Sequence, residues 1–131
     1  MEMIVSFPGG VAVNAEWKGH VIRTDQPEKD GGANAAPAPF DLFLASMATC
    51  MGFYALRFCQ ERQIDTAGLS LRMSLTRDPE SKKLTKIATR LVVPAGFPDK
   101  YDAAIIRAMD HCAVKRVIME PPQFETGVER G

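Results

Sequence analysis

The chain has 131 residues, of which 46% are hydrophobic and 24% are charged, and its formal net charge is zero. This composition is typical of a globular protein, and we expect a single domain over residues 1–131. There is no basic excess for nucleic acid, no signal-peptide pattern and no uninterrupted apolar run long enough to span a membrane. We therefore expect a cytoplasmic protein that binds neither nucleic acid nor membranes.

Apolar and polar side chains alternate in the first two dozen residues, as they do in half-buried strands. The pattern predicts strands over residues 3–7, 11–17 and 20–24, with Lys18-Gly19 as a two-residue hairpin turn. A loop rich in glycine, proline and charged residues follows over residues 25–38. Connecting loops of this length are often functional.

A long helix is predicted over residues 39–63, beginning at Pro39, where the missing N–H of proline costs nothing. Asp41 lies in its first turn, where the helix dipole favours a negative charge. Almost every face is apolar or small, so we expect this helix to be buried on all sides. Small residues surround Cys50 and allow another backbone to come close: Ala45, Ser46, Ala48, Thr49 and Gly52. We expect any chemistry to take place at Cys50.

The second half of the chain begins with a clean alternation that predicts a long antiparallel hairpin. Its strands cover residues 69–76 and 86–93, and its turn lies at residues 79–82. The hairpin adds two strands to the three at the N-terminus. Runs of strands separated by single helices indicate an α+β fold.

Helical spacing returns after the hairpin. Asp99 is the predicted cap of a second helix whose inward stripe ends at Cys112. Residues 113–119 predict a short further helix, and residues 124–129 form either a last edge strand or a frayed tail.

Three widely spaced cysteines, Cys50, Cys59 and Cys112, do not form the framework of a secreted disulfide-rich protein. In a reducing compartment they are core residues, metal ligands or reactive thiols. Residue type alone favours two core cysteines at Cys50 and Cys112, because free cysteine is among the most buried residue types. Cys59 lies on the face of the helix opposite to Cys50, and we expect it to be structural.

No motif predicts a metal or a cofactor. The sequence has no CxxC, no HxxxH and no glycine-rich nucleotide motif, so we expect neither. A nucleophilic pair of Cys50 with His111 is left open, although no local signature supports it.

Two motifs together resemble the OsmC/Ohr family, the osmotically inducible and organic hydroperoxide resistance proteins. The first helix of that family opens with proline, an acidic or amide residue and leucine, and runs through small residues to a cysteine; here these are Pro39, Asp41, Leu42 and Cys50. The second motif is Cys-Pro-Val followed by a basic residue, and here it begins at Cys112 and has alanine in place of proline. The order of strands and helices also agrees.

The resemblance implies an intertwined homodimer whose antiparallel sheets wrap around central helices. It also implies a thiol-dependent peroxidase, an oxidoreductase of the oxidative stress response, that acts on hydroperoxides and preferably on organic ones. Cys50 would attack the peroxide as a thiolate and become a sulfenic acid, and Cys112 would condense with it to a disulfide. A dithiol, such as a lipoyl group, would then reduce that disulfide.

Two positions depart from the peroxidase members. In those members an acidic residue ten positions before the first cysteine anchors an arginine beside the thiolate, and here that position is Phe40. Asp41 is the neighbouring carboxylate, which serves either as that anchor or as a helix-dipole charge. Arg23 is the only arginine before Cys50. It is either the activating cation or a solvated strand residue.

The departure at Phe40 motivates an alternative function. An OsmC-like protein without strong peroxidase activity would bind an apolar or acyl ligand at the dimer interface. The apolar residues Met47, Met51 and Phe53 near Cys50 fit such a ligand. A structural pair of core cysteines is the third interpretation.

Overall fold

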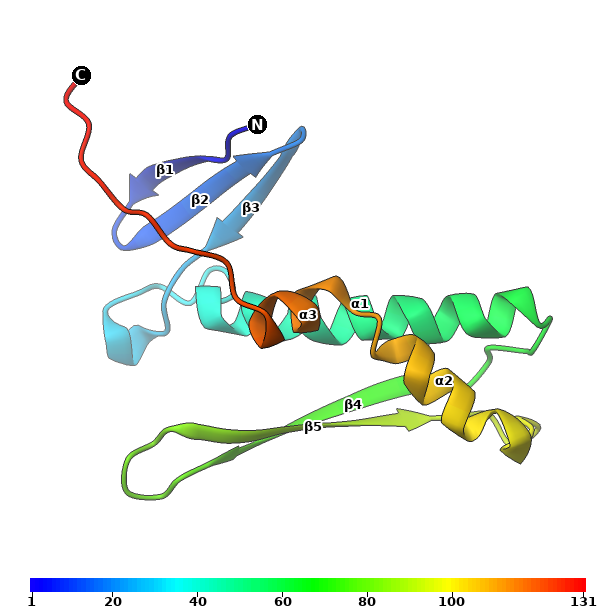
Figure 1. Ribbon diagram of the computed structural model, residues 1–131. Coiled ribbons are helices and arrows are strands. Elements are labelled where there is room, and N and C mark those ends of the chain that lie inside the picture. Colours follow the sequence, from blue (N-terminus) through cyan, green and yellow to red (C-terminus); the bar gives the residue numbers. More distant parts are fainter. The chain divides into compact units, whose positions relative to one another are not determined.

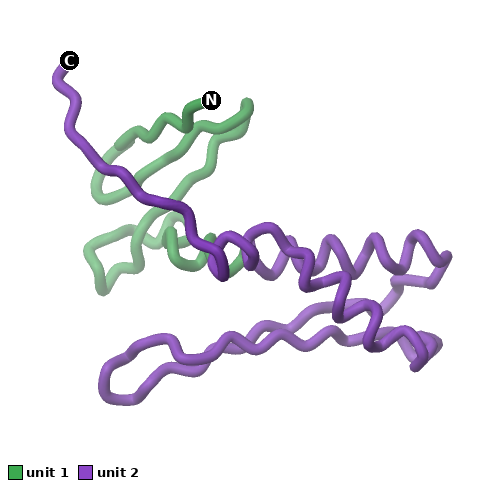
Figure 2. Tube along the Cα trace, in the orientation of Figure 1, with its two compact units in different colours: residues 1–45 green, residues 46–131 purple.

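The computed structural model describes the whole chain, Met1–Gly131. It contains five strands and three α-helices, which confirms an α+β protein with antiparallel sheets. The chain divides into two compact units, Met1–Ala45 and Ser46–Gly131, as Figure 2 shows. The expectation of one domain over residues 1–131 stays a prediction.

The first unit holds a three-stranded antiparallel sheet in the order β1-β2-β3. Its strands are β1 (Ile4–Gly9), β2 (Ala12–Trp17) and β3 (His20–Thr24), as the sequence pattern predicts. Lys18 and Gly19 both have positive φ angles, 50° and 82°, and Trp17 pairs directly with His20. Two positive φ angles in succession make the tight hairpin turn that the sequence indicates.

The loop after β3 is organised by the carboxylate of Asp25, which is 4% exposed. Its Oδ2 accepts hydrogen bonds from the N–H groups of Ala35 at 3.1 Å and Ala33 at 3.2 Å, and its Oδ1 accepts one from Gln26 at 2.8 Å. The bonds from Ala35 and Gln26 lower the pKa of Asp25, and burial opposes them only in part. One side chain therefore fixes much of a loop that has a single 3₁₀ turn, η1 (Glu28–Asp30).

Helix α1 (Pro39–Glu61) begins in the first unit and continues through the second. It ends two residues earlier than predicted. Gln63 has a φ angle of 54°, which leaves the helical region, and Ile64 donates its N–H back to the carbonyl of Cys59 at 2.9 Å.

The expectation that α1 is buried on all sides is wrong for the single chain. Its buried residues form one stripe: Met47, Met51, Ala55, Phe58 and Cys59. On other faces Phe53 is 50% exposed and Leu56 is 37% exposed. The reason is that, within one chain, one hairpin and two short helices pack against only one side of α1. Judged by length and composition alone, α1 is long and apolar enough to cross a membrane. The core helices of soluble proteins meet the same two criteria.

The second unit contains a two-stranded antiparallel sheet of β4 (Ser70–Arg77) and β5 (Leu84–Val92), close to the predicted hairpin. Leu71 pairs with Leu91, and Met73 pairs with Thr89. The apolar face of the hairpin packs against the buried stripe of α1, and the two lie side by side in Figure 1.

The last elements are η2 (Asp99–Tyr101), α2 (Asp102–Met109) and α3 (Ala113–Met119). Asp99 does not cap a helix as predicted, because the chain already turns at Pro98 and Asp99 lies within the 3₁₀ turn. Cys112 also differs from the prediction. It lies after α2 has ended, at the N-cap of α3. Residues 124–129 form no strand.

Candidate active site

Cys50 and Cys112 are 62 positions apart in the sequence and come together in the second unit. The Cys112 thiol is hydrogen-bonded to Cys50 and also lies 3.9 Å from the carbonyl oxygen of Met47, one helical turn before Cys50. Cys112 is completely buried, whereas Cys50 is partly exposed. The S–H of Cys112 therefore has two acceptors, and the Cys50 sulfur is the one that solvent reaches.

The start of α3 supplies further donors. The N–H groups of Ala113 and Val114 point to the Cys50 sulfur, and the N–H of Lys115 donates to Cys112 Sγ at 3.4 Å. The first N–H groups of a helix have no partner within the helix, so they are free to bind an anion. The family motif has proline at the position of Ala113, and proline has no N–H. The departure from the motif therefore adds one donor to the site.

The two thiols differ in acidity. Burial raises the pKa of Cys50, but hydrogen bonds from Cys112, Val114 and Ala113 and the charge of Arg116 outweigh it, so that the pKa is lowered. Burial also raises the pKa of Cys112, and there the neighbouring Cys50 adds to the effect. Cys50 is thus the thiol that ionises first, with Cys112 as its protonated partner.

Cys59 shows what burial does without such donors. It is completely buried in the core cluster, and burial raises its pKa while Arg62 opposes this only weakly. This agrees with the structural role that the sequence predicts for it.

Arg116 is the cation whose charge acts on Cys50, and the sequence reasoning did not select it. The available signal was its place on α3, four residues after Cys112, where a helix brings a side chain back to the same face. Arg23, the predicted candidate, lies exposed on β3 opposite Asn14 in the first unit. Its role stays a prediction.

The start of α1 carries the two other residues singled out from the sequence. Asp41 is exposed in the first turn of the helix. Phe40 stacks on Phe43, with the ring centroids 5.6 Å apart. The role of Asp41 as an anchor stays a prediction.

No histidine contributes to the surroundings that shift the pKa of Cys50, so a Cys50–His111 nucleophilic pair has no support. The His111 ring instead lies beside Tyr54, with the ring centroids 6.3 Å apart. No group of three or more histidine, cysteine, aspartate or glutamate residues is arranged to hold a metal ion.

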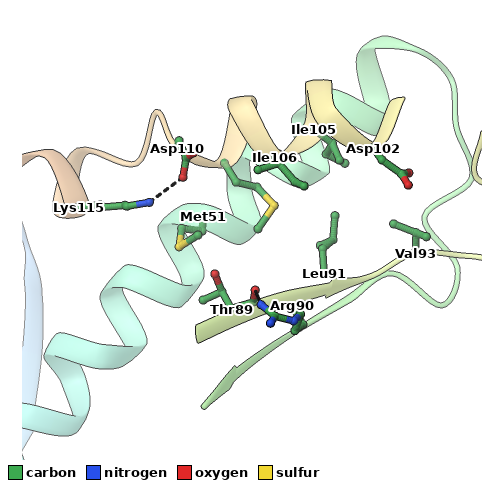
Figure 3. Close-up of a pocket in the computed structure, with 11 residues that line it drawn as sticks. Met51, Thr89, Arg90, Leu91, Val93, Asp102, Ile105, Ile106, Asp110 and Lys115 are labelled. Carbon is green, nitrogen blue, oxygen red and sulfur yellow. Dashed lines mark hydrogen bonds and ion pairs between the residues drawn. The ribbon is translucent and has the colours of Figure 1, made fainter. Parts of the chain in front are cut away.

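A cavity of about 510 Å³ opens between α1, α2 and β5, in the unit that holds both cysteines (Figure 3). Apolar side chains from all three elements line it, among them Met51, Leu91 and Ile105. An ion pair of 2.7 Å between Lys115 and Asp110 lies at its edge. A smaller cavity of about 180 Å³ shares Met51 and Lys115 with it. Met51, which follows Cys50 in the sequence, is thus part of the wall of both cavities, whereas neither cysteine lines them.

A family model described as OsmC-like protein matches residues 31–127, which include both cysteines and all three helices. The chain belongs to the OsmC-like protein family. This confirms the resemblance on which the sequence interpretation rests. None of the curated protein sequences matches the chain.

Solved structures agree on the fold. A Psychrobacter arcticus protein named for osmotic stress induction and a detoxification response is 21% identical with a TM-score of 0.71, over 87% of this chain and 85% of that one. An organic hydroperoxide resistance protein OsmC from Legionella pneumophila is 21% identical with a TM-score of 0.54, over 90% of this chain and 89% of that one. An OsmC-like protein of unknown function from Vibrio cholerae is 12% identical with a TM-score of 0.59, over 88% of this chain and 90% of that one. The fold is therefore that of OsmC-like proteins.

Proposed function

We propose that this OsmC-like protein is a thiol-dependent peroxidase that reduces organic hydroperoxides. The proposal rests on two adjacent thiols that differ in exposure and in the direction of their pKa shifts. Cys50 is partly exposed with a lowered pKa, and Cys112 is buried, protonated and in contact with it. A reactive thiolate next to a second thiol is the arrangement that converts a sulfenic acid into a disulfide. Membership of a family that includes an organic hydroperoxide resistance protein supports the same conclusion.

In the first step the Cys50 thiolate attacks one peroxide oxygen. A sulfur–oxygen bond forms, the oxygen–oxygen bond breaks, and the second oxygen leaves as an alkoxide that takes up a proton to become the alcohol. Cys50 is oxidised to the sulfenic acid, and the hydroperoxide is reduced. The N–H groups of Ala113 and Val114 and the charge of Arg116 stabilise the thiolate before the attack.

In the second step Cys112 attacks the Cys50 sulfur. The disulfide forms, and the sulfenic oxygen leaves as water with the proton of the Cys112 thiol. A dithiol reductant, for which a lipoyl group is our candidate, then exchanges with the disulfide and becomes oxidised itself. Cys112 is already in contact with Cys50, so this step needs no large movement of the chain.

The proposal includes an intertwined homodimer and a cytoplasmic location. Part of the apolar surface of α1 is left uncovered by its own chain, including Phe53 and Leu56. A surface of this kind is typical of a protein interface. A single species of 14.4 kDa in sedimentation velocity would contradict the dimer.

The test is the consumption of cumene hydroperoxide with a dithiol as reductant. We expect turnover by the wild type and none by Cys50→Ser. In Cys112→Ser with the dithiol left out, one equivalent of hydroperoxide should still be consumed, because the Cys50 sulfenic acid forms but cannot condense with a second thiol of the chain. Wild-type consumption no faster than that of Cys50→Ser would refute the peroxidase.

The cavity of about 510 Å³ favours a second candidate function, the binding of an apolar or acyl ligand. Its volume lies in the range of small-molecule pockets, and Met51 and Leu91 give it an apolar wall. This candidate predicts a ligand that is carried through purification and is retained after Cys50 has been alkylated. A protein that is purified without ligand and binds no fatty acid would contradict it.

A further inference from the structure

A second hollow of the molecule, separate from the apolar cavity, is rich in arginine. It has a volume of about 350 Å³ and lies between the second half of α1 and α2. Its lining includes Arg57, Arg62 and Arg107, against the single carboxylate of Glu61. We call it the arginine groove. Nothing in the peroxidase mechanism uses it.

Glu61 neutralises little of this charge. It lies 3.6 Å from Arg57, one helical turn away, and the two side chains are 61% and 54% exposed. An exposed ion pair of this kind is held loosely and is readily exchanged for another partner. The remaining arginines therefore keep an excess of positive charge in the groove.

Arg62 is held in place by the protein itself. Its guanidinium lies 3.6 Å from the centroid of the Phe58 ring, and it donates a hydrogen bond of 3.2 Å to the carbonyl oxygen of Phe58. The Tyr101 ring lies on it as well, at 5.6 Å. An arginine that is already ordered loses less conformational freedom when it binds an anion, while its other N–H groups stay available.

Arg107 lies on the last turn of α2 and has neither an ion pair nor a side-chain hydrogen bond within the chain. It faces the groove from the helix opposite to Arg57 and Arg62. Two helices thus present guanidinium groups to one hollow. A guanidinium has the planar geometry that binds carboxylate or phosphate through two parallel hydrogen bonds.

The groove ends close to the cysteines. Tyr54, which is one helical turn after Cys50, and His111, which precedes Cys112, both line it, and their rings are neighbours at 6.3 Å. The phenol and the imidazole add polar groups at this end.

We propose that the arginine groove binds a small molecule that carries at least two oxyanion groups, carboxylate or phosphate. One such group lies between Arg62 and Arg107, and a second displaces Glu61 from Arg57. The volume of about 350 Å³ is sufficient for a small dianion or trianion. This inference does not depend on the peroxidase reaction.

Calorimetric titration with two probes tests it: pyrophosphate for phosphate groups and tricarballylate for carboxylates. The wild type is compared with Arg107→Gln, which removes one guanidinium that makes no ion pair or side-chain hydrogen bond within the chain. The matched control is Arg72→Gln, which loses the same charge on the exposed, outward face of β4. We expect at least one probe to bind, about tenfold or more weakly in Arg107→Gln, and unchanged in Arg72→Gln.

The two probes also distinguish the sources of the oxyanion. Binding of pyrophosphate alone assigns the groove to phosphates, and binding of tricarballylate alone assigns it to carboxylic acids. Equal weakening in both variants would show general attraction to surface charge and overturn the proposal. So would the absence of binding, which is the result if a second copy of the chain fills the groove. Peroxidase assays of the same variants test the two proposals separately, because neither Arg107 nor Arg72 takes part in the proposed peroxidase steps.

Discussion

The backbone N–H of Ala113 gives the sharpest test of how the chain lowers the pKa of Cys50. Ala113 is the first residue of α3, a position where proline is well accepted, and Cys112 before it has the extended ψ of 118° that a following proline requires. The substitution Ala113→Pro therefore keeps the backbone and removes one donor to the Cys50 sulfur. It also restores the Cys-Pro-Val motif of the family.

The size of the effect follows from the number of donors. A hydrogen bond to a charged group contributes about 1.5–3 kcal/mol, but sulfur is a weak acceptor and Cys50 keeps its bonds from Cys112 and Val114. We take a loss of about 1 kcal/mol, which raises the pKa of Cys50 and, at a pH below that pKa, lowers the population of its thiolate and the rate of alkylation about fivefold. When the solution is acidified, Cys50 of the Ala113→Pro variant therefore becomes protonated and unreactive at a higher pH than Cys50 of the wild type.

The assay is the rate of iodoacetamide alkylation of each cysteine as a function of pH, resolved by peptide mass spectrometry. Ala113→Val is the control, because valine keeps the N–H and changes the side chain. The buried Cys59 is an internal reference that should stay unmodified in the native protein. An Ala113→Pro variant whose Cys50 titrates at the wild-type pKa, with α3 intact by hydrogen exchange, would refute the reasoning.

Three further changes test other parts of the structure. In Cys112→Ala the pKa of Cys50 should rise more than in Cys112→Ser, because serine keeps a donor; equal alkylation profiles would contradict the hydrogen bond between the thiols. Ile105→Ala should reduce the free energy of unfolding in urea by about 2–3 kcal/mol. This value is at the lower end for truncations of buried isoleucine, because Ile105 already borders an open cavity. A loss below about 1 kcal/mol would argue against the packing of Ile105 in the core. Asp25→Asn should destabilise the loop after β3 at neutral pH. Because the folded pKa of Asp25 is lowered from 3.8, its stabilisation is present above that value and is lost as the pH falls through the folded pKa. Hydrogen exchange of residues 26–37 should therefore differ between wild type and variant at neutral pH and converge in strong acid, and a difference that is independent of pH would contradict this.

Local patterns in the sequence are sufficient for the elements of the fold. Alternation of apolar residues predicts the five strands, and the pair Lys18-Gly19 predicts a turn that needs two positive φ angles. A long run of apolar and small residues that begins at Pro39 predicts α1, and helical spacing predicts α2. Each of these depends on a few neighbouring residues. The sequence also indicates through two motifs that Cys50 and Cys112 belong to one site, and the family match agrees with the motifs.

The tertiary structure decides what depends on residues that are far apart in the chain. Whether a face of α1 is covered depends on the elements that pack against it, and within one chain these cover a single stripe. The lowered pKa of Cys50 depends on Cys112 and Arg116, which lie more than sixty positions away. Cys112 meets Cys50 from the N-cap of α3, where the chain changes direction, and periodicity cannot place a residue outside a helix. The sequence alone determines that the chain has a long helix with a cysteine in its interior, and the packing of α3 against that helix decides that the pKa of this cysteine is lowered.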